Sequence, residues 1–211
     1  MVKTGIVLAA ATAALAWGVP AQAASPVLPK GFLLTEKAAA GPHKPDERWK
    51  VDNRRTTGLL LDPCEHRYWS GKKATDRGRI ASRTIVKSVE VESWGEQVAL
   101  YRDVKAAKAV MKDLRADLRR CAVSGGEEYL RTTYTSRPLD VGDEGIRALH
   151  SDFEGAVRFV AVRGAAAVLI YMEAGGSARG LPVKDFRALV KQAGTMAARV
   201  CALPRARCHR A

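Results

Sequence analysis

The stretch "AVRFVAVRGAAAVLIYMEAGG", residues 156–176, decides the fold. Apolar side chains fill both alternating positions over 157–162 and again over 166–172, and Arg163-Gly164 separates the two runs. A strand with apolar residues on both sides is buried on both faces, so this stretch predicts a hairpin of two central strands. One long apolar helix is the rival interpretation, and the glycines and the Val, Ile and Phe content argue against it.

Two amphipathic helices accompany these strands. After Asp103, a residue type that caps helices, apolar residues recur at intervals of three and four as far as Cys121. A last helix begins at Pro182 and ends at Cys201, with the same apolar spacing.

Four further strands are expected outside the central hairpin. Residues 83–93 alternate between apolar and polar, and 96–102 follow a turn at Trp94-Gly95. Residues 127–139 and 144–155 are the next two candidates. The order β-β-α-β-β-β-β-α is dominated by hairpins. We therefore expect an α+β domain, a mainly antiparallel β-sheet of about six strands with the two principal helices packed on one face and stapled by disulfides.

The beginning of the chain has the three-part pattern of a secretory signal peptide. In residues 1–23, Lys3 precedes an apolar run, and Ala-Gln-Ala offers small residues for cleavage. The alternatives are a buried N-terminal helix or an uncleaved anchor. We expect a soluble, secreted protein with no transmembrane segment and no lipid anchor. Residues 24–55, rich in Pro, Gly and charge, are expected to be a flexible lead segment, and 56–211 a single α+β domain.

The four cysteines, Cys64, Cys121, Cys201 and Cys208, predict two disulfides in an exported protein. Three pairings are open. We favour Cys64–Cys121 and Cys201–Cys208, because a Leu-Pro turn lets the chain fold back between the last two. Spacings typical of zinc sites are missing from the sequence, so we expect no metal site and no cofactor.

Catalytic motifs are likewise missing from the sequence, and we assign no catalytic residue. The carboxylates of Glu90, Glu92 and Glu96 are explained by strand alternation and solvation. The stretch "HRYWSGKK", residues 66–73, is both aromatic and basic. We therefore hold Tyr68 and Trp69 as candidate ligand-binding residues.

The net positive charge of the chain is the feature that most suggests a binding function. The chain has 35 lysines and arginines against 22 aspartates and glutamates, a formal net charge of +13. Such a field attracts anionic partners such as envelope polymers or lipid headgroups, although a plain cationic surface explains it equally well. The cations are not interleaved with aromatic residues along the chain, so we expect no nucleic-acid binding.

Several of these features together resemble a known family. They are an early "DPC", the helix "ALYRDVKAAKAVMKDLRADLRRC" ending in cysteine, a "GDEG" turn, the strands around "VAVRG", and the final helix "FRALVKQAGTMAARVC". This set is similar to the PknH-like extracellular sensor domains of actinobacteria over residues 56–203. Some of these domains belong to receptor Ser/Thr kinases, and others are free exported proteins or lipoproteins.

The resemblance implies a disulfide-stabilised antiparallel sheet with a solvent-exposed cleft and a ligand-sensing role. Cys64 and Cys121 match the family's bridge, whereas Cys201–Cys208 departs from its pattern. We therefore expect a secreted, non-enzymatic binding or sensor-like domain that recognises a small molecule, a lipid or an anionic envelope component. The alternatives are an exported hydrolase or enzyme inhibitor, and a cationic wall-associated structural protein.

Overall fold

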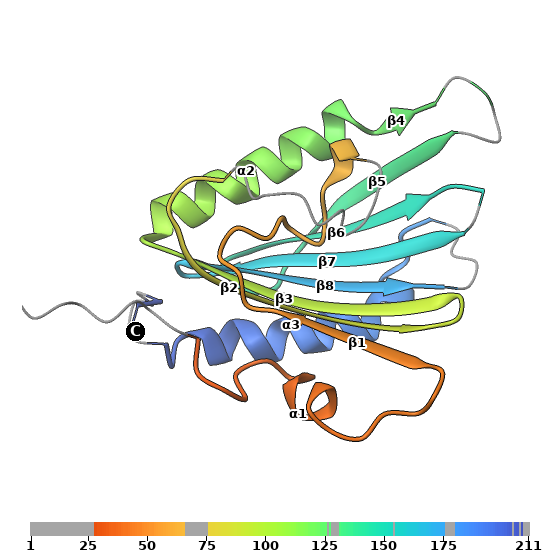
Figure 1. Ribbon diagram of the computed structural model, residues 1–211. Helices are drawn as coiled ribbons and strands as arrows, with labels where there is room; N and C mark the ends of the chain where they lie inside the picture. Colours follow the sequence, from red (N-terminus) through yellow and green to blue (C-terminus); the bar gives the residue numbers. More distant parts are fainter. Residues whose placement is uncertain are drawn as a thin grey trace, which may run out of the picture.

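The computed structural model describes residues 28–65, 76–125, 127, 131–153, 155–175, 180–203, 205–206 and 208. Eight strands form one antiparallel sheet in the order β1-β2-β3-β8-β7-β6-β5-β4, with helices on both sides (Figure 1). The strands are β1 (Glu47–Asp52), β2 (Arg79–Val89), β3 (Glu92–Tyr101), β4 (Val123–Ser124), β5 (Thr132–Leu139), β6 (Glu144–Ser151), β7 (Ala156–Gly164) and β8 (Ala167–Ala174). The helices are α1 (Glu36–Ala39), α2 (Val104–Arg120) and α3 (Arg187–Val200), with short 3-10 turns η1 (Pro63–Glu65) and η3 (Val183–Phe186).

The predicted central hairpin is confirmed as β7 and β8, which pair along their whole length. Val160 and Val162 of β7 belong to one hydrophobic cluster, while Phe159 and Ala161 belong to the other. All four side chains are fully buried. Both faces of the central strands are therefore covered, as the unbroken apolar runs require.

The expectation that both helices lie on one face is wrong. α2 packs on the face that carries Phe159, and α3 packs on the face that carries Val160. Figure 1 shows the two helices on opposite sides of the sheet. The physical reason is the same two-sided hydrophobicity, because each apolar face of β7 and β8 needs its own covering layer.

The sheet has eight strands and not about six. The two additions are β1 and the two-residue β4, which form opposite edges of the sheet. The hairpin between β2 and β3 turns at Glu90 and Val91, so the turn expected at Trp94-Gly95 is also corrected. Trp94 and Gly95 lie inside β3, paired with Lys87 and Val86 of β2.

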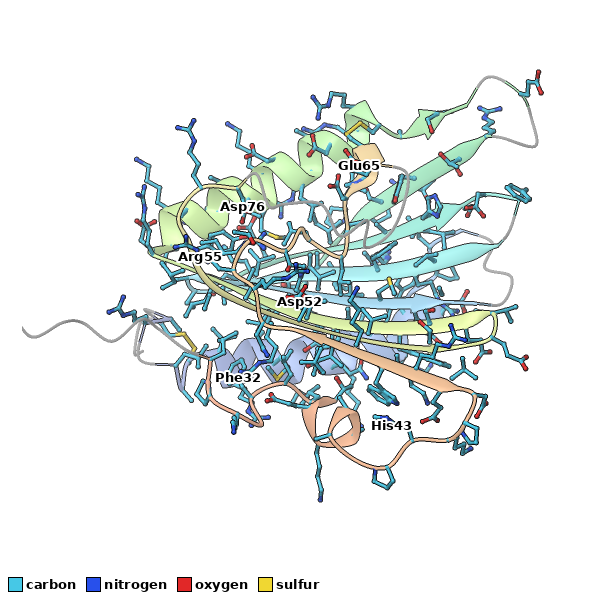
Figure 2. All side chains as sticks on the ribbon, in the orientation of Figure 1. Phe32, His43, Asp52, Arg55, Glu65 and Asp76 are labelled. Carbon is cyan, nitrogen blue, oxygen red and sulfur yellow. A yellow bond between two sulfur atoms is a disulfide. The ribbon has the colours of Figure 1, made fainter. Side chains whose placement is uncertain are left out.

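Residues 28–52 contribute a helix and an edge strand, although a flexible lead was expected over 24–55. Leu28, Phe32 and Leu33 are buried in the cluster beneath α3. Figure 2 shows Phe32 on the side of the molecule that α3 covers. The described fold thus begins well before residue 56.

The signal peptide predicted over 1–23 lies outside the described residues and stays a prediction. Within the part of the chain that the structure describes, no helix has the length and hydropathy needed to cross a membrane.

Both favoured disulfide pairings are confirmed. Cys64–Cys121 joins η1 to the end of α2, and Cys201–Cys208 closes a short loop after α3. The α2 start is confirmed as well, since the Asp103 carboxylate accepts a hydrogen bond from the Ala106 amide at 2.7 Å.

Removing the two disulfides should destabilise the protein unequally. The loops span 57 and 7 residues of sequence. By the chain-entropy estimate, closing these loops raises the free energy of the unfolded chain by about 4 and about 2.5 kcal/mol respectively. Urea unfolding should show the larger loss for Cys64→Ser with Cys121→Ser, and the smaller loss for Cys201→Ser with Cys208→Ser. The reverse order would contradict this account.

The carboxylate of Asp52 should make stability depend on acidity. Asp52 is buried at the end of β1 and accepts hydrogen bonds from Arg54 and from the Thr57 hydroxyl. The hydrogen bonds from Arg54 lower the pKa of Asp52 to about 2. The unfolded carboxyl has a pKa of about 3.9, so it binds its proton first as pH falls.

We therefore expect the free energy of unfolding to fall between pH ~4.5 and ~2, with Asp52 accounting for about 1–2 kcal/mol after screening at the exposed Arg54. Asp52→Asn should lose this part of the pH dependence, whereas Asp46→Asn, at an exposed position, should keep it. Urea unfolding measured at several pH values tests the difference, and identical profiles for the two variants would refute it.

Candidate functional site

A small hollow opens on the α3 face of the sheet. Its volume is about 250 Å³, and its lining comes from β1, β2, β3, β8, α3 and the segment just before α1. The lining is mainly apolar, with a few polar groups among the rings and aliphatic side chains. The volume lies just below the roughly 300–1,000 Å³ of typical ligand pockets.

Two tryptophans and a lysine form one wall of this hollow. Trp49 of β1 lies opposite Lys87 of β2, which in turn lies opposite Trp94 of β3. The Lys87 ammonium lies 5.6 Å and 5.2 Å from the two ring centroids. The Lys87 ammonium also forms an ion pair with the Glu47 carboxylate at 2.9 Å. The His43 ring stacks on the Trp49 ring, with the two ring centroids 5.3 Å apart. The lysine therefore fixes both indole rings by cation–π attraction.

A buried carboxylate forms the base of the hollow. Glu96 is 2% exposed and accepts hydrogen bonds from the Leu34 amide at 3.0 Å and the Thr35 amide at 2.9 Å. The Thr35 and Tyr171 hydroxyls donate to it at 2.7 Å and 3.0 Å. Solvation was expected for this residue, and that expectation is wrong. Glu96 holds the segment before α1 against the sheet and so builds the opposite wall.

The hydroxyl of Tyr171 stays a proton donor in this setting. Burial raises its pKa well above the ordinary value, and the neighbouring Glu96 charge raises it further. The site thus offers neutral ring surfaces and satisfied polar groups, an arrangement that suits binding by contact. Among the described residues, no group of three His, Cys, Asp or Glu side chains is placed to hold a metal ion.

A second hollow, of about 340 Å³, lies on the α2 face beside the Cys64–Cys121 disulfide. The ion pair of Asp76 and Arg79, at 2.8 Å, forms part of its lining. The Tyr101 hydroxyl donates a hydrogen bond to the same carboxylate. Figure 2 shows Asp76 beneath α2. This second hollow is more polar, and the charges that line it are already partly paired.

The sequence-predicted site residues fall in different places. The four cysteines form the two disulfides, and neither disulfide lines the tryptophan hollow. Tyr68 and Trp69 lie outside the described residues and stay a prediction.

Sequence reasoning missed Trp49, Lys87, Trp94 and Glu96 as neighbours. Trp49 fell in the expected lead segment and Trp94 in an expected turn. The signal that could have found them is the spacing of Ile85 and Lys87 on one face of β2, with Trp94 and Glu96 at the matching spacing on β3.

The fold defines the protein as an α+β domain in which helices cover both faces of one antiparallel sheet. The chain matches no protein-family model and no curated protein. Among solved structures it is similar to the extracellular domain of PknH from Mycobacterium tuberculosis. The identity is 13%, with 81% of this chain and 91% of that chain covered, at a TM-score of 0.50.

It is also similar to an Rv0999 ortholog from Mycobacterium smegmatis. For this pair the identity is 10%, with 84% of this chain and 99% of that chain covered, at a TM-score of 0.40. At such low identities, the likeness to the PknH domain indicates a related fold.

Replacing Glu96 should free the segment before α1. In Glu96→Ala, two amides and two hydroxyls lose their acceptor, which should cost about 2–4 kcal/mol of unfolding free energy. Hydrogen exchange should show faster exchange at the amides of Leu34 and Thr35. Glu92→Ala, at an exposed glutamate of the same strand, should leave both amides protected. Unchanged protection in Glu96→Ala would show that the carboxylate does not hold the segment.

Proposed function

We propose that the protein is an exported, non-enzymatic binding module of the sensor type, which recognises a small, partly apolar molecule in the tryptophan hollow. The observation that carries this proposal is the pair of indole rings, fixed by Lys87, in a hollow with a mainly apolar lining. Rings held in place before binding lose little conformational entropy when a ligand arrives.

Three observations support export and a sensor-like role. The first 23 residues have the composition of a signal peptide. Two disulfides staple the chain, which is typical of proteins that fold in oxidising compartments. The fold is related to that of the extracellular domain of PknH.

The chemistry of the hollow narrows the ligand class. The Lys87 ammonium is already paired with Glu47 and with two ring faces, so a cationic ligand would meet an occupied position. The ring faces of the two tryptophans suit an aromatic ring or the end of an acyl chain. The Gln192 amide at the rim can hydrogen-bond a neutral or anionic head group.

The test uses anilinonaphthalene sulfonate, an aromatic anion whose fluorescence rises in apolar sites. We expect saturable binding with energy transfer from tryptophan, and a dissociation constant that rises about tenfold in Trp94→Ala, because one stacking surface is lost. Trp94→Leu, which keeps apolar volume, should show a smaller rise. Fluorescence titration measures the dissociation constants of the unsubstituted protein and of the two Trp94 variants. Circular dichroism checks that each variant is folded.

Phe153→Ala is the matched control, because Phe153 is an apolar side chain 72% exposed on the turn between β6 and β7. It should leave the affinity unchanged. Equal weakening in the Phe153 and Trp94 variants would assign the dye to general apolar surface. Absence of saturable binding would contradict the proposed site.

A further inference from the structure

The basic and the acidic residues of α2 lie on different flanks of the helix. Lys105, Lys108, Lys112, Arg115 and Arg119 recur at intervals of three and four along the helix. At 100° per residue these five positions fall within a sector of about 80°, and they extend over about 21 Å of the helix axis. Figure 2 shows long side chains ending in nitrogen that project from the outer side of α2. We call these five residues the basic ridge.

The acidic residues of α2 lie on its other flank. Asp113 and Asp117 border the second hollow, and Asp117 is paired with Arg120 at 2.6 Å. They therefore do not neutralise the ridge. The buried face of the helix, with Met111 and Leu114, lies against the sheet. The two charged flanks are exposed to solvent, with the small side chains of Ala109 and Ala116 between them.

Within the part of the chain that the structure describes, most of the ridge has no carboxylate partner. Arg115 pairs with Glu144 at 2.6 Å. Lys105, Lys108, Lys112 and Arg119 are exposed, and no carboxylate of the described residues forms an ion pair with them. Four cations in a line that have no carboxylate partner among the described residues produce a positive potential, which falls off over about 8–10 Å at physiological salt.

A groove continues from one end of the ridge. Lys108 borders a groove of about 660 Å³ that extends to the Cys201–Cys208 disulfide. At its floor, Arg163 is ion-paired with Asp143 at 2.6 Å and is 5% exposed. The groove thus adds room for an extended chain, while the ridge supplies the unpaired charge.

The shape of the ridge selects among anionic partners. Its cations follow one another about every 4.5–6 Å along the helix axis, a spacing that suits a linear polymer with regularly repeated negative groups. None of the large apolar side chains exposed in the described residues belongs to α2, which disfavours insertion into a lipid surface. α2 also contains no aromatic residue on which a nucleobase could stack.

We propose that the basic ridge of α2 binds a linear phosphate polymer of the cell envelope. This site lies on the opposite face of the sheet from the tryptophan hollow, so it does not depend on the proposed ligand of that hollow. Occupation of the ridge holds the protein at the polymer by charge while the other face stays accessible.

The test measures binding of linear inorganic polyphosphate to the purified protein at several salt concentrations. In the triple variant Lys105→Gln, Lys108→Gln, Lys112→Gln the dissociation constant should rise roughly 10- to 100-fold. The slope of its logarithm against log salt should fall by about 2, at roughly 0.7 per lost contact for a single-stranded chain. The polar substitutions keep the helix surface hydrophilic, and circular dichroism verifies the fold.

The control variant removes the same charge elsewhere, with Lys30→Gln, Lys37→Gln and Lys44→Gln at exposed positions of the N-terminal segment. It should change the dissociation constant less than about twofold, since only the long-range field changes. Equal weakening by both triple variants would assign binding to net charge and overturn the ridge. Tighter ridge-dependent binding of duplex DNA or of anionic vesicles, at equal phosphate concentration, would overturn the choice of polymer.

Discussion

The structure depends on the burial of the central strands on both faces. β3, β8 and β7 lie between other strands, so their backbone groups are paired within the sheet. Side chains such as Val98 and Ala99, adjacent along β3, are both fully buried although they point to opposite sides. One helix layer could cover only one of these sides. The chain therefore carries α2 across one face and brings α3 back across the other.

Covering the α3 face also requires the N-terminal segment. Charged side chains from the sheet hold this segment, because a buried charge must be paired or hydrogen-bonded. Arg83 donates to the carbonyls of Leu28 and Pro29 and pairs with Glu36 at 2.8 Å, while Glu96 binds the amides that follow. These contacts turn a proline- and glycine-rich segment into part of the core. They also create the wall of the tryptophan hollow, so site and fold share the same buried charges.

The elements with strong periodicity could be predicted from sequence. The runs in 157–172 and the spacing in α2 and α3 need no knowledge of distant contacts, and the cysteine pairing followed from chain proximity. β1 could not be found in this way, because only one side chain of this edge strand is buried, and that one is the charged Asp52. The side of the sheet on which each helix packs depends on contacts between distant parts of the chain. The position of Trp49 and Trp94 on either side of Lys87 depends on the register of three strands. Local sequence does not encode that register alone.

The net charge of +13 illustrates the same limit. Arg79, Arg83 and Arg163 are all buried, and each is balanced by a carboxylate of the fold. Their charges stabilise the interior and contribute little to the field outside. The charges of α2 differ from these buried arginines, because the inner face of the helix is apolar and its charged residues lie on the flanks that face solvent. Placing acidic groups on one flank and cations on the other gives a directed field, which a count of residues cannot distinguish from an evenly cationic surface.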